Sequence, residues 1–209
     1  MLLSTAHFPP LQYISKIVNA DSFYLESKEN YQKQSYRNRH IIFGANGPIT
    51  LSIPIVKGRT PGSPIKEVKI DSTDRWRSIH QRAIESSYRH SPFYEFYYDD
   101  LRVFWEKDWK FLYDLNLEIL ICILELLELD INILETSSFS REVEESGTDY
   151  RQRIHPKKPW QDDPEFISVE YTQNFSDRHG FIANLSIIDL IFQTGPEAVG
   201  ILKKSIRLL

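Results

Sequence analysis

The chain has 209 residues, 41% of them hydrophobic and 26% charged, a balance typical of a globular domain and too apolar for general disorder. Its formal net charge of -4 argues against a protein that works mainly by neutralising nucleic-acid phosphates, so we expect no nucleic-acid partner. Cys122 is the only cysteine, which excludes an internal disulfide and fits a reducing, cytoplasmic compartment.

We expect no targeting segment and no membrane span. The N-terminus lacks a basic region followed by an apolar stretch of signal-peptide length. In the most hydrophobic part of the chain the longest unbroken apolar run is 119–124, far below the roughly 20 residues that a bilayer requires.

Strand-forming residues dominate 23–70. β-branched and aromatic residues recur throughout 39–56, and Asn46-Gly47 between two apolar runs indicates a hairpin. A loop rich in proline and glycine is expected at 57–64, followed by a short strand at 65–70.

From about residue 73 to 130 the apolar period becomes helical. The first helix starts near Thr73 or Asp74, and its predicted buried face consists of Trp76, Ile79, His80, Ala83, Ile84 and Ser87. His80 is expected to be a hydrogen-bonded core histidine, with a catalytic role as the alternative. A later helix covers about 109–129, and four carboxylates on one line of it form either an exposed strip or a surface facing basic residues: Asp114, Glu118, Glu125 and Glu128.

A long charged loop is expected at about 137–164, between strands near 131–136 and 167–173. Its centre, "DYRQRIHPKK", places Arg151, Arg153 and His155 beside Asp149, and the loop is either functional or mobile.

Two short helices are expected near the C-terminus. Ser186 and Asp189 have the spacing of a capping box, and so do Thr194 and Glu197. Helix initiation explains Ser186 and Asp189, while the alternative is a nucleophile with its base.

Motifs for the common enzyme classes are missing. The six histidines show no HxxxH or HxH spacing and one cysteine cannot build a thiolate site, so the sequence predicts no metal site. The glycine-rich nucleotide loops and the GxSxG elbow are also absent, which leaves any cofactor unknown.

Two clusters suit an anionic ligand: Lys33 with Asn38 and Arg39, and Arg151 with Arg153 and His155. Arginine offers a planar fork of donors that matches phosphate or carboxylate, and asparagine and lysine add an amide and a compact charge. The alternative for each cluster is a charged strand edge or loop.

Several blocks of the chain resemble successive blocks of the WbqC-like protein family, in the same order. They are "TAHFPPLQYISKI", "ENYQKQSYRNRHII", "GPITLSIPIVKG", "WRSIHQRAIESSYRHSPFYEFYYDD", "DYRQRIHPKK" and "YTQNFSDRHGFIANLSIIDLIFQTGPEA". The resemblance implies a role in cell-surface polysaccharide biosynthesis, with acyl or aminoacyl transfer as a suggested reaction. It also favours a ligand site at Lys33, Asn38 and Arg39, which recur in that block of the family. His7 departs from the family pattern, in which a tyrosine or another non-titrating residue is expected.

We therefore expect one domain over 1–209 with an α/β or α+β fold, in which helices pack on a mixed sheet. The leading hypothesis is a transferase for an activated sugar or acyl donor that carries an anionic group. Lys33, Asn38, Arg39 and Arg151 would bind that group with His155, and Asp149 or Asp189 would act as a base. The competing hypothesis is a non-catalytic scaffold for a glycan-assembly enzyme, with the aromatic stretch 93–105 as its partner surface.

Overall fold

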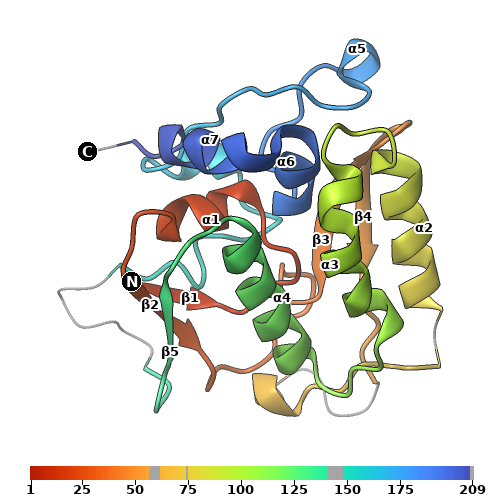
Figure 1. The fold of residues 1–209 in the computed structure, drawn as a ribbon. Helices are drawn as coiled ribbons and strands as arrows, with labels where there is room; N and C mark the ends of the chain where they lie inside the picture. Colours follow the sequence, from red (N-terminus) through yellow and green to blue (C-terminus); the bar gives the residue numbers. More distant parts are fainter. Residues whose placement is uncertain (57–61, 74, 141–147, 208–209) are drawn as a thin grey trace.

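The computed structural model describes residues 1–56, 62–73, 75–140 and 148–207 (Figure 1). The strands are β1 (Leu2–Ser4), β2 (Ser22–Glu26), β3 (Arg39–Gly44), β4 (Gly47–Ser52) and β5 (Asn132–Glu135). The α-helices are α1 (Leu11–Ile17), α2 (Trp76–Tyr88), α3 (Tyr94–Glu106), α4 (Leu112–Leu126), α5 (Ser176–His179), α6 (Ile187–Thr194) and α7 (Ala198–Lys204). Short 3-10 helices cover Ile65–Glu67, Trp160–Asp162 and Gly195–Glu197.

A parallel sheet with the strand order β1-β2-β5 forms one end of the molecule. Residues 148–150 run parallel to β1 on its other side. The Leu2 N–H donates to the Thr148 carbonyl (3.0 Å), and the Tyr150 N–H donates to the Leu2 carbonyl (2.9 Å). Because all these segments run in the same direction, their carboxyl ends lie at one edge of the sheet.

β3 and β4 form a separate antiparallel hairpin, which pairs Arg39 with Ser52 and Gly44 with Gly47. The predicted hairpin is therefore confirmed, with Ala45 and Asn46 as the two turn residues. α2 and α3 lie beside the hairpin, whereas α6 and α7 lie along α1 (Figure 1).

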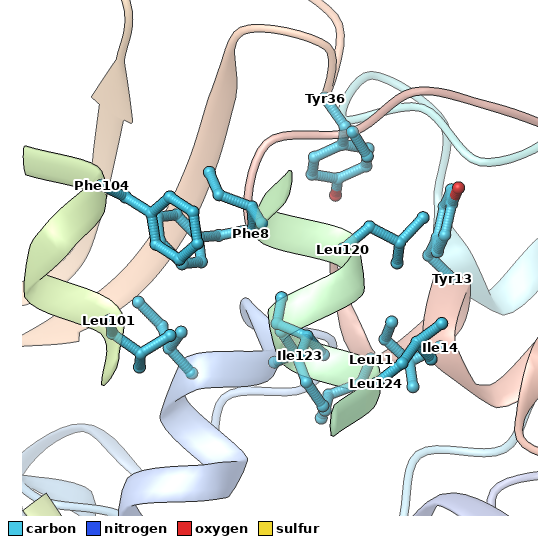
Figure 2. Close-up of a cluster of buried hydrophobic side chains, with 14 of the residues drawn as sticks. Phe8, Leu11, Tyr13, Ile14, Tyr36, Leu101, Phe104, Leu120, Ile123 and Leu124 are labelled. Carbon is cyan, nitrogen blue, oxygen red and sulfur yellow. The ribbon is translucent and has the colours of Figure 1, made fainter. Parts of the chain in front are cut away.

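α4 runs through the centre of the hydrophobic core. Figure 2 shows its Leu120, Ile123 and Leu124 between Leu101 and Phe104 of α3 on one side and the side chains of α1 on the other. The predicted helix over 109–129 is thus confirmed. Its carboxylates form the exposed strip of an otherwise buried helix, since Asp114, Glu118, Glu125 and Glu128 are all exposed.

The predicted fold class is confirmed, because helices pack on both parallel and antiparallel strands. Two predicted strands are wrong. Residues 65–70 begin with a 3-10 helix, and residues 167–173 form no strand, although the Ile167 N–H donates to the Ser205 carbonyl (2.9 Å). Alternating side chains identify extended backbone in such segments, but they do not show whether a partner strand is present.

The predicted helix after residue 73 is α2, which begins at Trp76; its proposed start at Asp74 and the loop residues 57–61 lie outside the described residues. Most of its predicted inner face is correct, and Trp76, His80 and Ile84 are buried. Ile79 is an exception, because its side chain is 54% exposed. The hairpin and α3 cover a narrower face of α2 than the apolar pattern suggested.

Gly47 and Gly200 form a matched pair for a test of the hairpin turn. Gly47 has φ +106°, which a residue with a Cβ rarely adopts, whereas Gly200 lies exposed in α7 with open space around its Cα. Gly47→Ala should lower the free energy of unfolding by about 1–2 kcal/mol. Gly200→Ala should raise it by about 0.5–1 kcal/mol, as measured by urea denaturation. Equal effects of the two changes would contradict the strained turn.

Candidate functional site

Polar residues from distant parts of the chain meet at the carboxyl edge of the parallel sheet. Ser4 ends β1, Glu26 ends β2, and Arg151 follows the segment 148–150 that pairs with β1. Ligand sites of α/β proteins form at this edge, where the loops after neighbouring strands diverge.

Arg37 joins the loop after β2 to the end of β1. Its Nε donates to Glu29 Oε1 (2.8 Å), and its Nη2 donates to Glu29 Oε2 (2.5 Å) and to Ser4 Oγ (2.6 Å). The side chains of Arg37 and Glu29 are both 3% exposed. A buried bidentate pair of this kind fixes both groups firmly, because either charge left alone would be poorly solvated.

Arg151 makes a second buried network beside the first. Its Nη1 donates to Glu26 Oε2 (2.7 Å) and its Nη2 to Asp149 Oδ2 (2.7 Å). Burial alone would raise the pKa of Asp149, but hydrogen bonds from Arg151 and its charge outweigh that effect and lower the pKa. Arg151 is therefore a paired cation, and Asp149 stays ionised at neutral pH.

A cleft of about 700 Å³ opens beside these networks. The segment after β2 and the segment after the β1 partner line it: Lys28, Glu29, Asn30, Tyr31, Gln32, Phe139, Asp149, Arg151 and Gln152. The cleft thus joins the two regions that the sequence analysis singled out, although Arg37, Glu26 and Glu29 were not among the predicted residues.

Positive charge gathers next to the cleft. Burial lowers the pKa of His155, and the charges of Arg37, Lys157, Lys158 and Arg39 lower it further. Burial raises the pKa of Tyr31, which lines the cleft, while Arg39 and Arg37 oppose this rise. The charge of Arg39 therefore affects the pKa of a group in each of the two segments, His155 and Tyr31. The Nε of Arg39 is buried and has no hydrogen-bond partner among the described residues.

The remaining residues of the first predicted cluster have different surroundings. Lys33 is exposed on the loop before β3. Asn38 is buried, and its Nδ2 donates to the Ile53 carbonyl (2.9 Å), which ties the chain before β3 to the chain after β4. Asn38 Oδ1 is buried without a partner among the described residues.

Asp189 lies in α6, in a separate polar centre. Neither Asp189 nor its hydrogen-bond partners line the cleft. Asp189 accepts hydrogen bonds from Tyr88 Oη (2.8 Å), Tyr171 Oη (2.6 Å) and Gln173 Nε2 (3.1 Å). Burial raises the pKa of Asp189 to about 6, although these three hydrogen bonds oppose the shift.

The predicted capping boxes are wrong. Ser186 Oγ donates to the Phe8 carbonyl (2.9 Å), and Asp189 is occupied by Tyr88, Tyr171 and Gln173, so no side-chain cap forms at the start of α6. Thr194 Oγ1 donates back to the Leu190 carbonyl (2.8 Å). Both residues use tertiary or intrahelical partners that sequence spacing does not reveal.

The family model of the WbqC-like protein family matches residues 5–157, which include both walls of the cleft. The chain belongs to the WbqC-like protein family. Comparison with curated proteins and with solved structures gave no match. In this WbqC-like chain, the block around Asp189 lies beyond the matched residues, whereas 31–40 and 149–155 lie within them.

Residues that could hold a metal ion were missed by the sequence analysis. His7, His40 and His80 come from three different elements and are gathered in the interior of this WbqC-like protein. The expectation of no metal site rested on spacing within single elements, and such spacing does not detect ligands brought together by the fold. None of the described helices has the length and apolar composition needed to cross a bilayer.

Arg151→Met tests the buried network. The change leaves Glu26 and Asp149 without their cation in a poorly solvated place, so the free energy of unfolding should fall by about 3–5 kcal/mol in urea denaturation. Arg153→Met is the matched control, because Arg153 is exposed, and should stay within about 0.5 kcal/mol of wild type. Glu26→Gln should recover part of the loss when combined with Arg151→Met. A neutral effect of Arg151→Met would contradict the network.

The pH dependence of the free energy of unfolding in Asp189→Asn tests the second polar centre. The folded-state pKa of about 6 lies above the usual 3.8, so ionised Asp189 destabilises the fold above pH 6, and this penalty fades as pH falls towards 4. The stability of Asp189→Asn relative to wild type should therefore be about 1 kcal/mol higher at pH 7 than at pH 5. Asp21→Asn, at an exposed site, is the matched control. A pH-independent difference for Asp189→Asn would refute the raised pKa.

Proposed function

We propose that this WbqC-like protein is a cytoplasmic transferase that binds an activated sugar or acyl donor with an anionic group at the carboxyl edge of its parallel sheet. The observation that carries the proposal is the cleft of about 700 Å³ between residues 28–32 and 149–152, together with the positive charges of Arg39, Lys157 and Lys158 around His155. Clefts of this size suit a ligand of the dimensions of a nucleotide or a sugar phosphate.

The anionic group of the donor would bind Arg39, whose Nε has no partner among the described residues, together with Lys28, which lines the cleft. Arg39 and the exposed Lys33 are not lining residues, so the anionic group would extend beyond the cleft to reach Arg39. Arg151 and Arg37 would not bind it directly, because carboxylates already neutralise them. Their role is to hold the two walls at a fixed distance. Asn38 would support Arg39 by fixing the start of β3.

His155 and Asp149 would handle the acceptor. The lowered pKa of His155 keeps its imidazole neutral at pH 7, so it can accept a proton from an incoming hydroxyl or amine. Asp149 remains ionised and can orient that group by accepting a hydrogen bond. Asp189 is left out of this mechanism, because its carboxyl is fully buried among tyrosines.

The aromatic walls give the cleft a second kind of contact. Tyr31 and Phe139 both line it, and flat side chains of this type stack on sugar or nucleobase rings. A sugar donor is consistent with surface-polysaccharide biosynthesis, the role that the family resemblance implies.

The scaffold alternative has weaker support. It needs the aromatic stretch 93–105 as a partner surface, but Tyr94, Phe104 and Trp105 are buried in the core. Phe96 is 75% exposed and remains the main apolar group that this stretch offers to a partner.

Calorimetric titration with a panel of nucleoside-diphosphate sugars and acyl phosphates tests the proposal. Wild type should bind at least one member, and Arg39→Gln should weaken that binding by about 10-fold to 100-fold, the value of a charge-assisted hydrogen bond. Arg102→Gln is the control, because Arg102 is an exposed arginine of α3 and should bind like wild type.

Two results would contradict this assignment in different ways. If wild type binds no member of the panel, the donor class is wrong. If Arg39→Gln binds as tightly as wild type, the donor sits elsewhere on the protein.

A further inference from the structure

Three histidines meet in the interior, away from the cleft. His7 lies in the loop between β1 and α1, His40 lies in β3, and His80 lies in α2. Each is at most 1% exposed, and one ring nitrogen from each lies within 4.8 Å of the other two. None of the three lines the cleft, so the cluster is a separate site from that cavity, although His40 directly follows Arg39 in β3.

The ring nitrogens of this cluster are unsatisfied. Both nitrogens of His7, both of His40 and Nδ1 of His80 are buried with no hydrogen-bond partner among the described residues. Each lost hydrogen bond of a buried polar group costs about 1–3 kcal/mol. No described residue lies at hydrogen-bond distance from these nitrogens, and an ion bound between the three rings would satisfy one nitrogen of each.

The cluster also keeps its lone pairs available. Burial lowers the pKa of His7, His40 and His80, so all three rings are neutral at physiological pH. Protonated rings would repel one another and a cation, whereas neutral imidazoles are good ligands for a divalent transition metal.

We propose that His7, His40 and His80 bind a zinc ion. His80 already has the outer arrangement of a metal ligand, because its Nε2 lies 3.2 Å from the Ser52 carbonyl and its Nδ1 has no hydrogen-bond partner in the part of the chain that the structure describes. Tetrahedral zinc ligands lie about 3.3 Å apart, so nitrogens that lie within 4.8 Å of one another would need to close by up to about 1.5 Å.

Asn116 of α4 supplies a candidate for the fourth position. Its Nδ2 donates to the Arg37 carbonyl (2.7 Å), while its Oδ1 is buried with no partner at hydrogen-bond distance among the described residues. The side chain lies close enough to His7 to oppose the lowering of the His7 pKa. With the Asn116 amide oxygen as the fourth ligand the site would be closed, as in structural zinc sites, whereas a water molecule there would leave the exchangeable position of a catalytic site.

Zinc at this point would join three separate parts of the fold. It would tie the loop after β1 to the β3–β4 hairpin and to α2, and the two sheets share no hydrogen-bonded strand pair among the described strands. The backbone N–H of His7 also donates to the Tyr36 carbonyl (2.8 Å), so the ion would stabilise the position of the chain that leads to Arg37 and Arg39.

The test uses full-length protein without an affinity tag, since a histidine tag would bind zinc itself. Wild type grown in zinc-replete medium should contain stoichiometric zinc by mass spectrometry. Cobalt added to chelator-treated protein should give the visible absorption of a tetrahedral site.

His40→Leu should lower zinc affinity more than about 100-fold, because outer partners of metal sites alone contribute 10-fold to 100-fold. His90→Leu, at an exposed histidine, should bind zinc like wild type.

A stability measurement covers the case in which a variant binds nothing because it is unfolded. Zinc should raise the melting temperature of chelator-treated wild type and His90→Leu, but not that of His40→Leu. In the presence of chelator, His40→Leu should be at least as stable as wild type, because it removes an unpartnered imidazole from the core.

The proposal is overturned if folded wild type takes up neither zinc nor cobalt in stoichiometric amount. It is also overturned if His40→Leu binds zinc as tightly as wild type does. Neither outcome would affect the donor site, which calorimetry with the donor panel tests separately.

Discussion

Two buried arginines determine the geometry of the carboxyl edge of the parallel sheet. Arg37 holds Glu29 and Ser4 together, and Arg151 holds Glu26 and Asp149. Charges taken out of water are tolerated only when each has its partner at short range, so these contacts cannot be relaxed one at a time. The walls of the cleft are therefore positioned by networks in which the arginines and carboxylates neutralise one another.

Three polar centres among the described residues differ in how well their groups are satisfied. The arginine network and the Asp189 centre consist of donors and acceptors at ordinary hydrogen-bond distances. The cluster of His7, His40 and His80 has almost none. A native core seldom leaves several nitrogens unpaired at one place, which is why this cluster, rather than Asp189, points to a bound ion.

Local patterns predicted the elements that local physics determines. The apolar period of 109–129, the hairpin residues and the strands around 23–52 and 131–136 agree with the structure, because burial of one face requires those patterns. Of the site residues predicted from the sequence, Asp149 and Arg151 line the cleft, whereas Lys33, Asn38, Arg39, His155 and Asp189 do not. The sequence did not predict that Arg151 pairs with Glu26, that Asp189 meets Tyr88 and Tyr171, or that the three histidines converge. Those contacts join positions with no common local period, so their partners follow only from the tertiary arrangement.

The pairing of Glu26 with Arg151 spans 125 residues, and the contact of Ser4 with the Arg151 carbonyl spans 147. During synthesis on the ribosome, Glu26 at the end of β2 emerges long before Arg151, the cation that neutralises it. The nascent N-terminal half must therefore keep Glu26 in contact with water until residue 151 has left the exit tunnel. Residues 148–151 can therefore complete this edge of the sheet only late in synthesis, even if β1 and β2 pair early.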